Sequence, residues 1–342
     1  MNFISGIILS FITVLVLVFI PFVGMQVANL QVLFGVVIPY LAMITFLAGV
    51  VGRLLLWSFS AVPFRIPTTA GQQKTLPWIK PNKLENPSTA AGVFGRMVLE
   101  IFLFRSLFRN STMEYREGPR VTYEWEKWLW LSAILFHYSF LVVLIRHLRF
   151  FTEPVPAFVT LIEALDGFMQ AGIGPLPGLM LPALFLSGVI LLAAAAYLFL
   201  RRIYIPTVRY ISLPTDYFPL LLIMAIAITG ILMRYLLKVD IVSAKQLVLG
   251  LVTFHPVLPQ GIGVLFYMHL FLVSCLLAYF PFSKLVHLGG VFLSPTRIMA
   301  NNNRMVRHIN PWNYPVKVHT YDEYEEEFKE KMIEAGIPVE KE

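Results

Sequence analysis

Three long blocks without a single charged residue constrain this chain more than any other feature of its sequence. They are residues 1–52, 167–200 and 246–283. Each block can hold a span of roughly 20 apolar residues, which as a helix crosses about 30 Å of hydrocarbon. Only 14% of the 342 residues are charged, against about 25% in a typical soluble domain. The sequence therefore predicts an integral membrane protein.

Six apolar segments are long enough to span a bilayer. They lie at about 3–24, 33–59, 127–148, 179–200, 217–237 and 263–283. The predicted fold class is an all-α six-helix membrane bundle. The first segment has no Lys/Arg-rich start and no obvious small-residue cleavage site, so we expect a retained helix rather than a signal peptide.

Basic residues predict the orientation of these helices. Residues 61–126, 201–216 and 284–342 together contain 20 Lys and Arg, whereas 149–178 and 238–261 contain three. By the positive-inside rule, both termini are expected in the cytoplasm and the chain in the cell membrane. The net charge of +7 is explained by this topology, and no nucleic-acid partner is expected.

Composition divides the chain into four predicted parts: an N-terminal transmembrane hairpin, a cytoplasmic loop, a four-helix transmembrane domain and a cytoplasmic tail. Their bounds are 1–60, 61–126, 127–287 and 288–342. In the loop, "VFGRMVLEIFLFRSLF" (93–108) predicts an amphipathic helix in the plane of the interface, with a re-entrant element as the alternative.

The tail mixes two kinds of sequence. "NNNRMVRHINPWN" is polar and basic, and "DEYEEEFKEK" predicts a short charged helix. Because Trp and Arg are common interface anchors, we expect the tail to dock a cytoplasmic partner, and a merely solvated tail is the alternative.

Four of the seven histidines fall on two predicted spans. His137 and His147 are ten residues apart on the third span, and His269 and His287 are eighteen apart on the sixth span and its inner extension. Since these spans run in opposite directions, His137 is expected at the depth of His287, and His147 at that of His269. Eighteen residues make five whole turns, so His269 and His287 are expected to share a helix face. Pro281 should kink that helix.

Two facing imidazoles inside a membrane point to a specific chemistry. Intramembrane histidines are costly unless they are paired, and an imidazole pair between helices suits axial ligation of haem iron. Spacing alone leaves a second interpretation open, in which these histidines form structural hydrogen bonds or a proton path. His255, His308 and His319 have no partner at metal-ligand spacing, and the single Cys275 excludes a Cys-ligated iron–sulfur cluster or an internal disulfide within this chain.

The histidine spacing resembles that of the di-haem cytochrome b subunit of respiratory nitrate reductase, the gamma-subunit family, over roughly residues 125–287. The tail at 289–342, and with it nearly the whole chain, resembles the DsrM branch of that family, found in sulfite-reduction-associated DsrMKJOP complexes. This chain departs from the five-helix nitrate reductase pattern by one additional N-terminal span and a long inner loop.

The resemblance implies two bis-histidine b-type haems. His137 and His287 are the implied iron ligands of the inner haem, and His147 and His269 those of the outer haem.

Basic residues near the histidines have two interpretations. Arg146 and Arg149 flank His147 and are expected either to bind haem propionates or to snorkel to the outer headgroups. At the inner end, Lys284 and Arg53 have the same two interpretations.

The family places quinol chemistry near the outer haem. The possible quinone contacts are Tyr138, Tyr267, Lys238 and Asp240, and ordinary interface-belt tyrosines are the alternative explanation of the first two.

The implied function is transfer of electrons from menaquinol to an iron–sulfur partner on the cytoplasmic side. In the DsrM branch that partner is DsrK, a heterodisulfide-reductase-like protein within the DsrMKJOP complex, and the final acceptor is the DsrC trisulfide. In sulfur-oxidising organisms the direction of flow is expected to reverse.

Three alternatives stay open: the cytochrome b anchor of another quinol-linked reductase, such as nitrate or heterodisulfide reductase; a haem-free proton-relay transporter; and a structural anchor. The transporter is disfavoured because the fourth span has no charged residue between Ser187 and Arg201.

Overall fold

A computed structural model describes residues 3–60, 72–118, 120–168, 184–305 and 318–340. Within them, six helical segments are long and apolar enough to cross a membrane. Their main helices are α1 (Phe3–Ala28), α2 (Ile38–Phe59), α5 (Lys127–His147), α7 (Leu186–Tyr204), α9 (Pro214–Ile231) and α11 (Val264–Tyr279). The prediction of an all-α, six-span membrane protein is confirmed.

Short irregular turns extend four of these helices. A π-turn, η1 (Leu33–Val37), precedes α2, and another, η3 (Leu232–Leu236), follows α9. The 3₁₀ turns η2 (Leu148–Phe150) and η4 (Phe280–Phe282) follow α5 and α11. The Pro- and Gly-rich stretch at 171–182 lies outside the described residues, and the fourth span begins at Leu186 rather than near residue 179.

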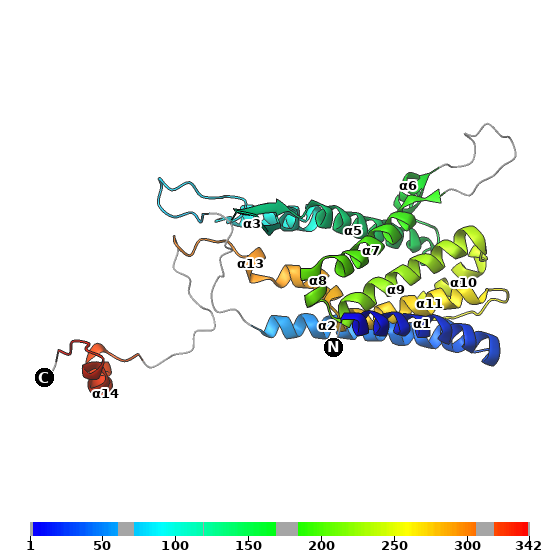
Figure 1. The fold of residues 1–342 in the computed structure, drawn as a ribbon. Helices are drawn as coiled ribbons and strands as arrows, with labels where there is room; N and C mark the ends of the chain where they lie inside the picture. Colours follow the sequence, from blue (N-terminus) through cyan, green and yellow to red (C-terminus); the bar gives the residue numbers. More distant parts are fainter. Residues whose placement is uncertain (1–2, 61–71, 119, 169–183, 306–317, 341–342) are drawn as a thin grey trace.

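The long helices cross the bundle in alternating directions (Figure 1). We call the end where α1, α5 and α9 begin the inner end, and the opposite end the outer end. Helix α5 packs along α7, α7 along α9, and α9 along α1 and α11, while α2 packs on α11. The bundle is therefore a sequence of neighbours with α5 at one side and α2 at the other.

The outer end carries structure that hydropathy did not predict. Its elements are α6 (Ala157–Asp166), α10 (Ile241–Val252) and the two-residue strands β3 (Gly167–Phe168) and β4 (Leu184–Phe185). An ion pair between Lys245 and Glu153 joins the two outer loops. Both helices are too short to span a membrane, which is why a search for spans passes over them.

The inner end is built from the long loop, the short connection after α7 and the first part of the tail. Its elements are α3 (Ala90–Leu103), α4 (Arg105–Phe108), β1 (Ser111–Arg116), β2 (Arg120–Trp125), α8 (Pro206–Ile211), η5 (Lys284–Val286), α12 (His287–Gly290), η6 (Val291–Leu293) and α13 (Pro295–Ile298). The helix predicted at 93–108 occurs as α3 and α4, broken at Phe104, whose φ is +48°. The antiparallel hairpin β1–β2 was not predicted.

Helix α11 ends earlier than its apolar pattern suggests. After Tyr279 the chain forms η4, becomes extended at Ser283 and forms η5 before α12 begins at His287. Pro281 lacks the N–H of a helical residue, and Ser283 Oγ accepts the Leu285 N–H at 3.1 Å, which caps the next turn. The prediction that His269 and His287 share a face of one helix is therefore wrong.

Packing inside the bundle is concentrated where α1, α2, α9 and α11 meet. Near the outer end, Met25, Phe34 and Phe271 belong to one buried cluster, in which the rings of Phe34 and Phe271 meet edge to face at 5.5 Å. A second cluster joins Val14, Leu222 and Leu272. Large apolar side chains on the outside of the bundle stay exposed and suit lipid as solvent.

In the tail, a charged helix α14 (Tyr321–Glu334) matches the predicted short helix. Thr320 caps it by accepting the Glu323 N–H at 3.3 Å. The basic stretch before it begins in the described residues 301–305, and its remainder, with His308 and Trp312, lies outside the described residues.

We predict that Gly49→Ala destabilises the protein and that Gly52→Ala does not. A Cβ on Gly49 would lie 2.5 Å and 2.7 Å from two ring carbons of Pro281, whereas a Cβ on Gly52 meets nothing within 4 Å. A proline ring cannot rotate away, so we expect an overpacking cost of about 1–3 kcal/mol. Thermal unfolding in detergent measures the difference, and equal melting temperatures for the two variants would contradict this close packing of α2 against Pro281.

Candidate functional site

The structure brings His137 and His287 together at the inner end. Their ring centres are 5.9 Å apart and the ring planes are nearly perpendicular, at 84°. His137 Nδ1 lies 2.7 Å from the Ala133 carbonyl oxygen, and His287 Nδ1 lies 2.9 Å from the Lys284 carbonyl oxygen. Both rings are thus fixed by backbone close to them in sequence.

His147 and His269 meet in the same way at the outer end. Their ring centres are 6.4 Å apart and the planes differ by 14°. His147 Nδ1 lies 2.7 Å from the Val143 carbonyl oxygen, and His269 Nδ1 lies 2.8 Å from Thr229 Oγ1 on α9. Both pairs match the pairing expected from the sequence.

Hydrogen bonding defines the tautomer of three of the imidazoles and suits the same tautomer in His269. A carbonyl oxygen only accepts, so Nδ1 of His137, His147 and His287 must carry the proton. Thr229 Oγ1 donates to the Ile226 carbonyl oxygen at 2.9 Å and so can accept from His269 Nδ1. Each Nε2 then keeps its lone pair, which is the state in which a neutral imidazole binds a metal.

The ring spacings fit a metal held between each pair. An imidazole–metal bond of roughly 2 Å, with the ring centre about 1 Å behind the nitrogen, puts the centres of two opposed rings roughly 6 Å apart. The observed spacings are 5.9 Å and 6.4 Å. Within the described part of the chain, no three His, Cys, Asp or Glu side chains gather as a metal-binding group. A two-ligand pair instead suits iron whose other positions are filled by a porphyrin.

The C-terminal end of α3 packs against His137 of the inner pair. At the left-handed residue Phe104 the chain turns, and the Phe104 ring meets the His137 ring edge to face at 4.9 Å. The last carbonyls of α3 accept hydrogen bonds from α5: Tyr138 Oη donates to Phe102 O at 2.9 Å, and Trp130 Nε1 donates to Leu103 O at 2.8 Å. These bonds fasten the end of α3 alongside α5 at the depth of His137.

The predicted cofactor arginines have protein partners. Arg146 Nη1 lies 2.7 Å from Asp166 Oδ2 and 3.2 Å from Ser187 Oγ. Arg149 Nη1 lies 2.5 Å from Glu163 Oε1. Both carboxylates belong to α6, which the sequence analysis had missed.

At the inner end, Lys284 Nζ lies 2.7 Å from Asp216 Oδ1 near the start of α9. The guanidinium carbon of Arg53 lies 5.7 Å from the centre of the Trp57 ring. Lys284 thereby links α9 to the turn whose carbonyl accepts the His287 Nδ1–H.

The possible quinone contacts separate in the structure. Tyr138 lies against α3 at the inner end, so its placement near the outer pair was wrong. Tyr267 is buried in the cluster with Phe34 and Phe271. Asp240 caps α10 by accepting the Val242 N–H at 2.9 Å and the Ser243 hydroxyl at 2.6 Å. Lys238 is exposed at the outer end.

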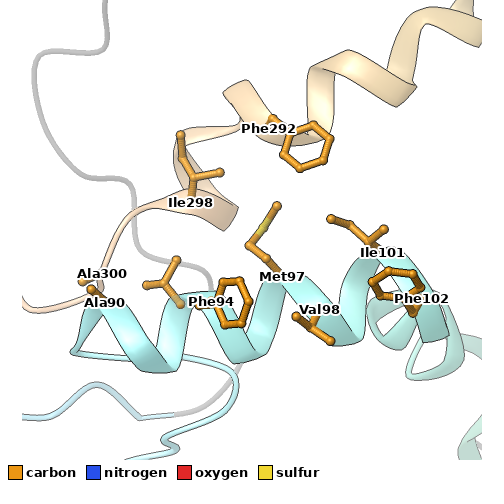
Figure 2. A pocket seen from close by; sticks show the side chains of 10 residues that line it. Ala90, Phe94, Met97, Val98, Ile101, Phe102, Phe292, Ile298 and Ala300 are labelled. Atoms are coloured by element: carbon orange, nitrogen blue, oxygen red, sulfur yellow. The ribbon is translucent and has the colours of Figure 1, made fainter.

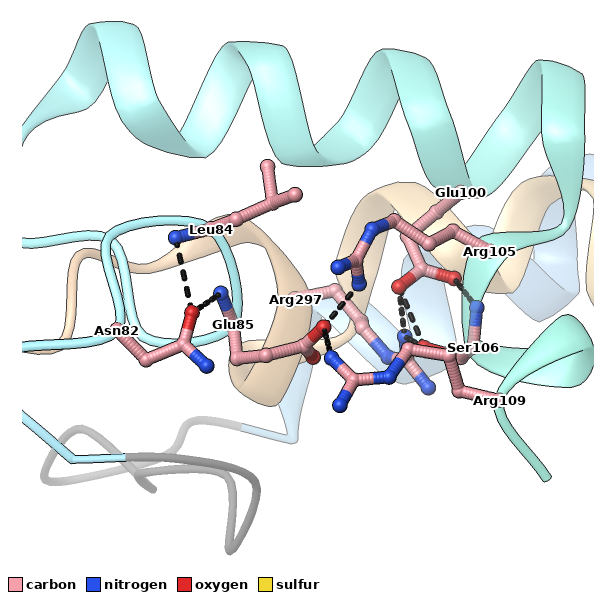
Figure 3. Close-up of polar contacts among 8 residues, drawn as sticks. All are labelled: Asn82, Leu84, Glu85, Glu100, Arg105, Ser106, Arg109 and Arg297. Carbon is pink, nitrogen blue, oxygen red and sulfur yellow. Dashed lines mark hydrogen bonds and ion pairs between the residues drawn. The ribbon is translucent and has the colours of Figure 1, made fainter. Parts of the chain in front are cut away.

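Residues 72–109 and 291–305 pack together at the inner end, and we call them the inner platform. The side chains of Asn86 and Asn301 are fully buried, and Asn301 Nδ2 donates to Asn86 Oδ1 at 2.7 Å. Arg297 lies 2.6 Å from Glu100, and Glu85 binds both Arg105 and Arg109 (Figure 3). The first part of the tail is thus a structural partner of the loop.

An apolar groove of about 600 Å³ crosses the inner platform between α3 and the segment with η6 and α13. Figure 2 shows Met97 rising from α3 toward Phe292 and Ile298 on the opposite wall. Phe94 lines the groove and is 73% exposed. This exposed apolar surface lies on the same helix whose far end touches the inner histidine pair.

Some functional candidates gave no signal in the sequence. Thr229, which binds His269, looks like an ordinary helix threonine. Gly230 follows it, and a Cβ at that position would meet His269 Cε1 at 3.4 Å. Arg297 is one of many basic residues in the tail. Arg234 is a charged residue on the predicted fifth span, and a charge inside a membrane span is a sequence signal for a functional residue.

Comparison with known proteins places these observations in a family. The model of the nitrate reductase gamma subunit family matches residues 92–308, which include all four paired histidines. An Archaeoglobus fulgidus protein, named Hdr-like menaquinol oxidoreductase cytochrome b-like subunit, is 48% identical over 289 residues, 82% of this chain and 84% of that protein. A protein of the same name from Archaeoglobus profundus is 43% identical over 282 residues, 81% of each chain.

We predict that acid loosens the inner platform through Glu85. Burial acts to raise the pKa of Glu85, but hydrogen bonds and positive charges from Arg105 and Arg109 outweigh it and hold the pKa below 4.5. A carboxyl whose folded pKa is lowered stabilises the fold above its unfolded pKa of about 4.3, and this contribution is lost as pH falls through the folded value. Protection factors of the platform amides, taken against the intrinsic exchange rate at each pH, should therefore fall on acidification below about pH 4.

Hydrogen exchange of the Glu85→Gln variant, compared with that of the control Glu114→Gln, tests this role of Glu85. Glu85→Gln should be less protected at neutral pH, by about 1.5–3 kcal/mol for a charge-assisted hydrogen bond, and less sensitive to acid than the unmodified protein. Glu114, whose side chain is 49% exposed beside Arg116, should behave like the unmodified protein. An unchanged acid response in Glu85→Gln would rule out this role.

Proposed function

Because this chain belongs to the nitrate reductase gamma subunit family, we propose that it is a quinol-linked membrane cytochrome b whose four paired histidines hold two haems. The observation that carries the proposal is the geometry of the pairs: two imidazoles at each of two depths, spaced for a metal, with Nδ1 committed and Nε2 available. When bound, haem iron takes up and releases one electron at a time.

In this proposal the protein holds the two haems at fixed positions. His137 and His147 are ten residues apart on α5, about 15 Å along a helix axis. His287 and His269 complete the two pairs from opposite ends of the α11–α12 segment. The four side chains therefore place two redox groups at different depths between the outer and the inner end. Thr229 and the three carbonyl oxygens hold the rings in the ligating tautomer.

Menaquinol is the proposed electron donor, since both relatives are named as subunits of a menaquinol oxidoreductase. We propose that it reacts near the outer pair, following the family resemblance. There Tyr267 and Lys238 remain candidate contacts, and the buried phenol of Tyr267 next to apolar neighbours suits a quinone slot.

The proposed electron acceptor is an iron–sulfur subunit of the heterodisulfide-reductase-like type, DsrK in the DsrM branch, with the DsrC trisulfide as the final acceptor and the other DsrMKJOP subunits as neighbours. The basic loops put the inner platform in the cytoplasm by the positive-inside rule. Its groove and its contact with the inner pair make it the proposed docking surface. We propose the same four parts that the sequence predicts: hairpin, loop, four-helix domain and tail. Residues 291–305 of the tail pack against the loop and form part of the inner platform.

We predict that His269→Ala removes one haem and spares the other. The purified protein should show two bis-histidine haems by pyridine haemochrome assay and redox titration, and the variant should show half that content. His255→Ala is the matched control, because the His255 ring belongs to neither pair and its Nδ1 lies 2.7 Å from the Thr253 carbonyl oxygen in the outer loop. A colourless unmodified protein would favour the transporter alternative, and equal loss of both haems would refute the assignment.

Docking on the groove predicts that Phe94→Glu weakens binding of the iron–sulfur subunit, about tenfold or more, while both haems are retained. A charge placed where an apolar anchor enters must be desolvated on binding. Met113→Glu is the control, because Met113 is 65% exposed on β1 and does not line the groove. Copurification and measured Kd values with the partner test this, and equal Kd values for the two variants would reject the groove as the contact.

A further inference from the structure

Arg234 lies on the π-turn η3, at the outer end of the fifth span. Its guanidinium carbon is 4.4 Å from the centre of the Phe185 ring, and that of Arg146 is 3.3 Å from the same ring. The Nε atom of Arg234 is buried and, among the described residues, has no hydrogen-bond partner. A guanidinium so placed inside a membrane protein requires an acceptor, since hydrocarbon offers none.

Protein carboxylates at the outer end are all engaged elsewhere. The outer loops, 149–178 and 238–261, contain four acidic residues. Their partners are Lys245 for Glu153, Arg149 for Glu163, Arg146 for Asp166, and the first turn of α10 for Asp240. Residues 169–183, outside the described part, contain no Asp or Glu. The chain therefore provides no free carboxylate for Arg234 at this end.

Helix geometry places Arg234 on the side of α9 that faces the outer pair. One turn earlier, Gly230 lies against His269, where a Cβ would be 3.4 Å from Cε1. In a regular α-helix a residue four positions later is rotated by about 40° past the first. The π-turn that begins at Leu232 has more residues per turn and reduces this offset. Arg146, which contacts the same Phe185 ring, directly precedes His147.

We propose that Arg234 binds a propionate carboxylate of the haem held by His147 and His269, an inference that rests on the proposed function. A charge-assisted pair with a carboxylate would satisfy the guanidinium. Arg146, for which the sequence left this role open, binds Asp166 and Ser187 through Nη1, although its Nε, like that of Arg234, is buried without a hydrogen-bond partner among the described residues. Arg234 is thus the outer arginine that no carboxylate of the described residues binds, and it is the proposed propionate anchor.

Loss of Arg234 has a defined consequence for the outer haem. Without the guanidinium, the propionate charge is no longer neutralised and favours ferric over ferrous iron. We expect a roughly tenfold shift of the oxidised-to-reduced ratio, which for one electron is about 59 mV. Because the inner pair lies about 15 Å away along α5, its haem should change much less.

The test compares Arg234→Met, Arg234→Lys and Lys245→Gln in the purified complex, by redox titration of both haems and by haem content. Lys245→Gln removes the same charge from the same end, but from an ammonium already paired with Glu153. We expect one haem potential to fall in Arg234→Met, a smaller fall in Arg234→Lys, and none in Lys245→Gln. If Arg234→Met does not fold, Arg234→Lys alone must still lower one potential.

Two results would overturn the inference. Unchanged potentials of both haems in the Arg234 variants would remove Arg234 from the propionate site while leaving the histidine ligation intact. An equal fall in Lys245→Gln would show a general charge effect instead of a specific contact. Absence of bis-histidine haem from the unmodified protein is a different failure, since it removes the proposed function itself.

Discussion

Polar groups within the bundle must find their partners in the protein, because the surrounding hydrocarbon supplies no hydrogen bonds. This constraint explains why each paired imidazole bonds through Nδ1 to a carbonyl oxygen or to Thr229. It also explains why Arg146 is joined to Asp166 and Ser187 across three helices. With Nδ1 bonded in this way, Nε2 is the nitrogen of each paired histidine that would hold the proposed haem iron.

The two histidine pairs are supported in different ways. At the outer end the ring of His269 is held by a neighbouring helix, through Thr229, and by close packing at Gly230. At the inner end His287 stands on its own short helix after a break in α11, and Phe104 from the loop covers His137. The outer pair thus belongs to the transmembrane bundle, whereas the inner pair also depends on segments outside it.

Hydropathy was sufficient to predict the spans and their alternation, and hence which histidines share a depth. They were insufficient where an interaction joins distant parts of the chain. The buried Asn86–Asn301 bond links residues 215 positions apart, and Gly49 of α2 packs closely against Pro281, just after α11. The partners of Arg146 and Arg149 lie on α6, a helix of ten residues that no span search selects. Local pattern carries no information about such partners.

A continuous set of contacts connects the inner platform to the inner histidine pair. Groove-lining Phe102 belongs to the last turn of α3, and its carbonyl accepts the Tyr138 hydroxyl next to His137. The other wall of the groove, at Phe292, follows His287 by one short helix. A protein that docks in the groove would contact segments leading to both imidazoles of the pair. The same chain segments that recruit an electron acceptor would then also fix the geometry of the group that supplies it, while the Lys284–Asp216 ion pair ties His287 back to α9 of the bundle.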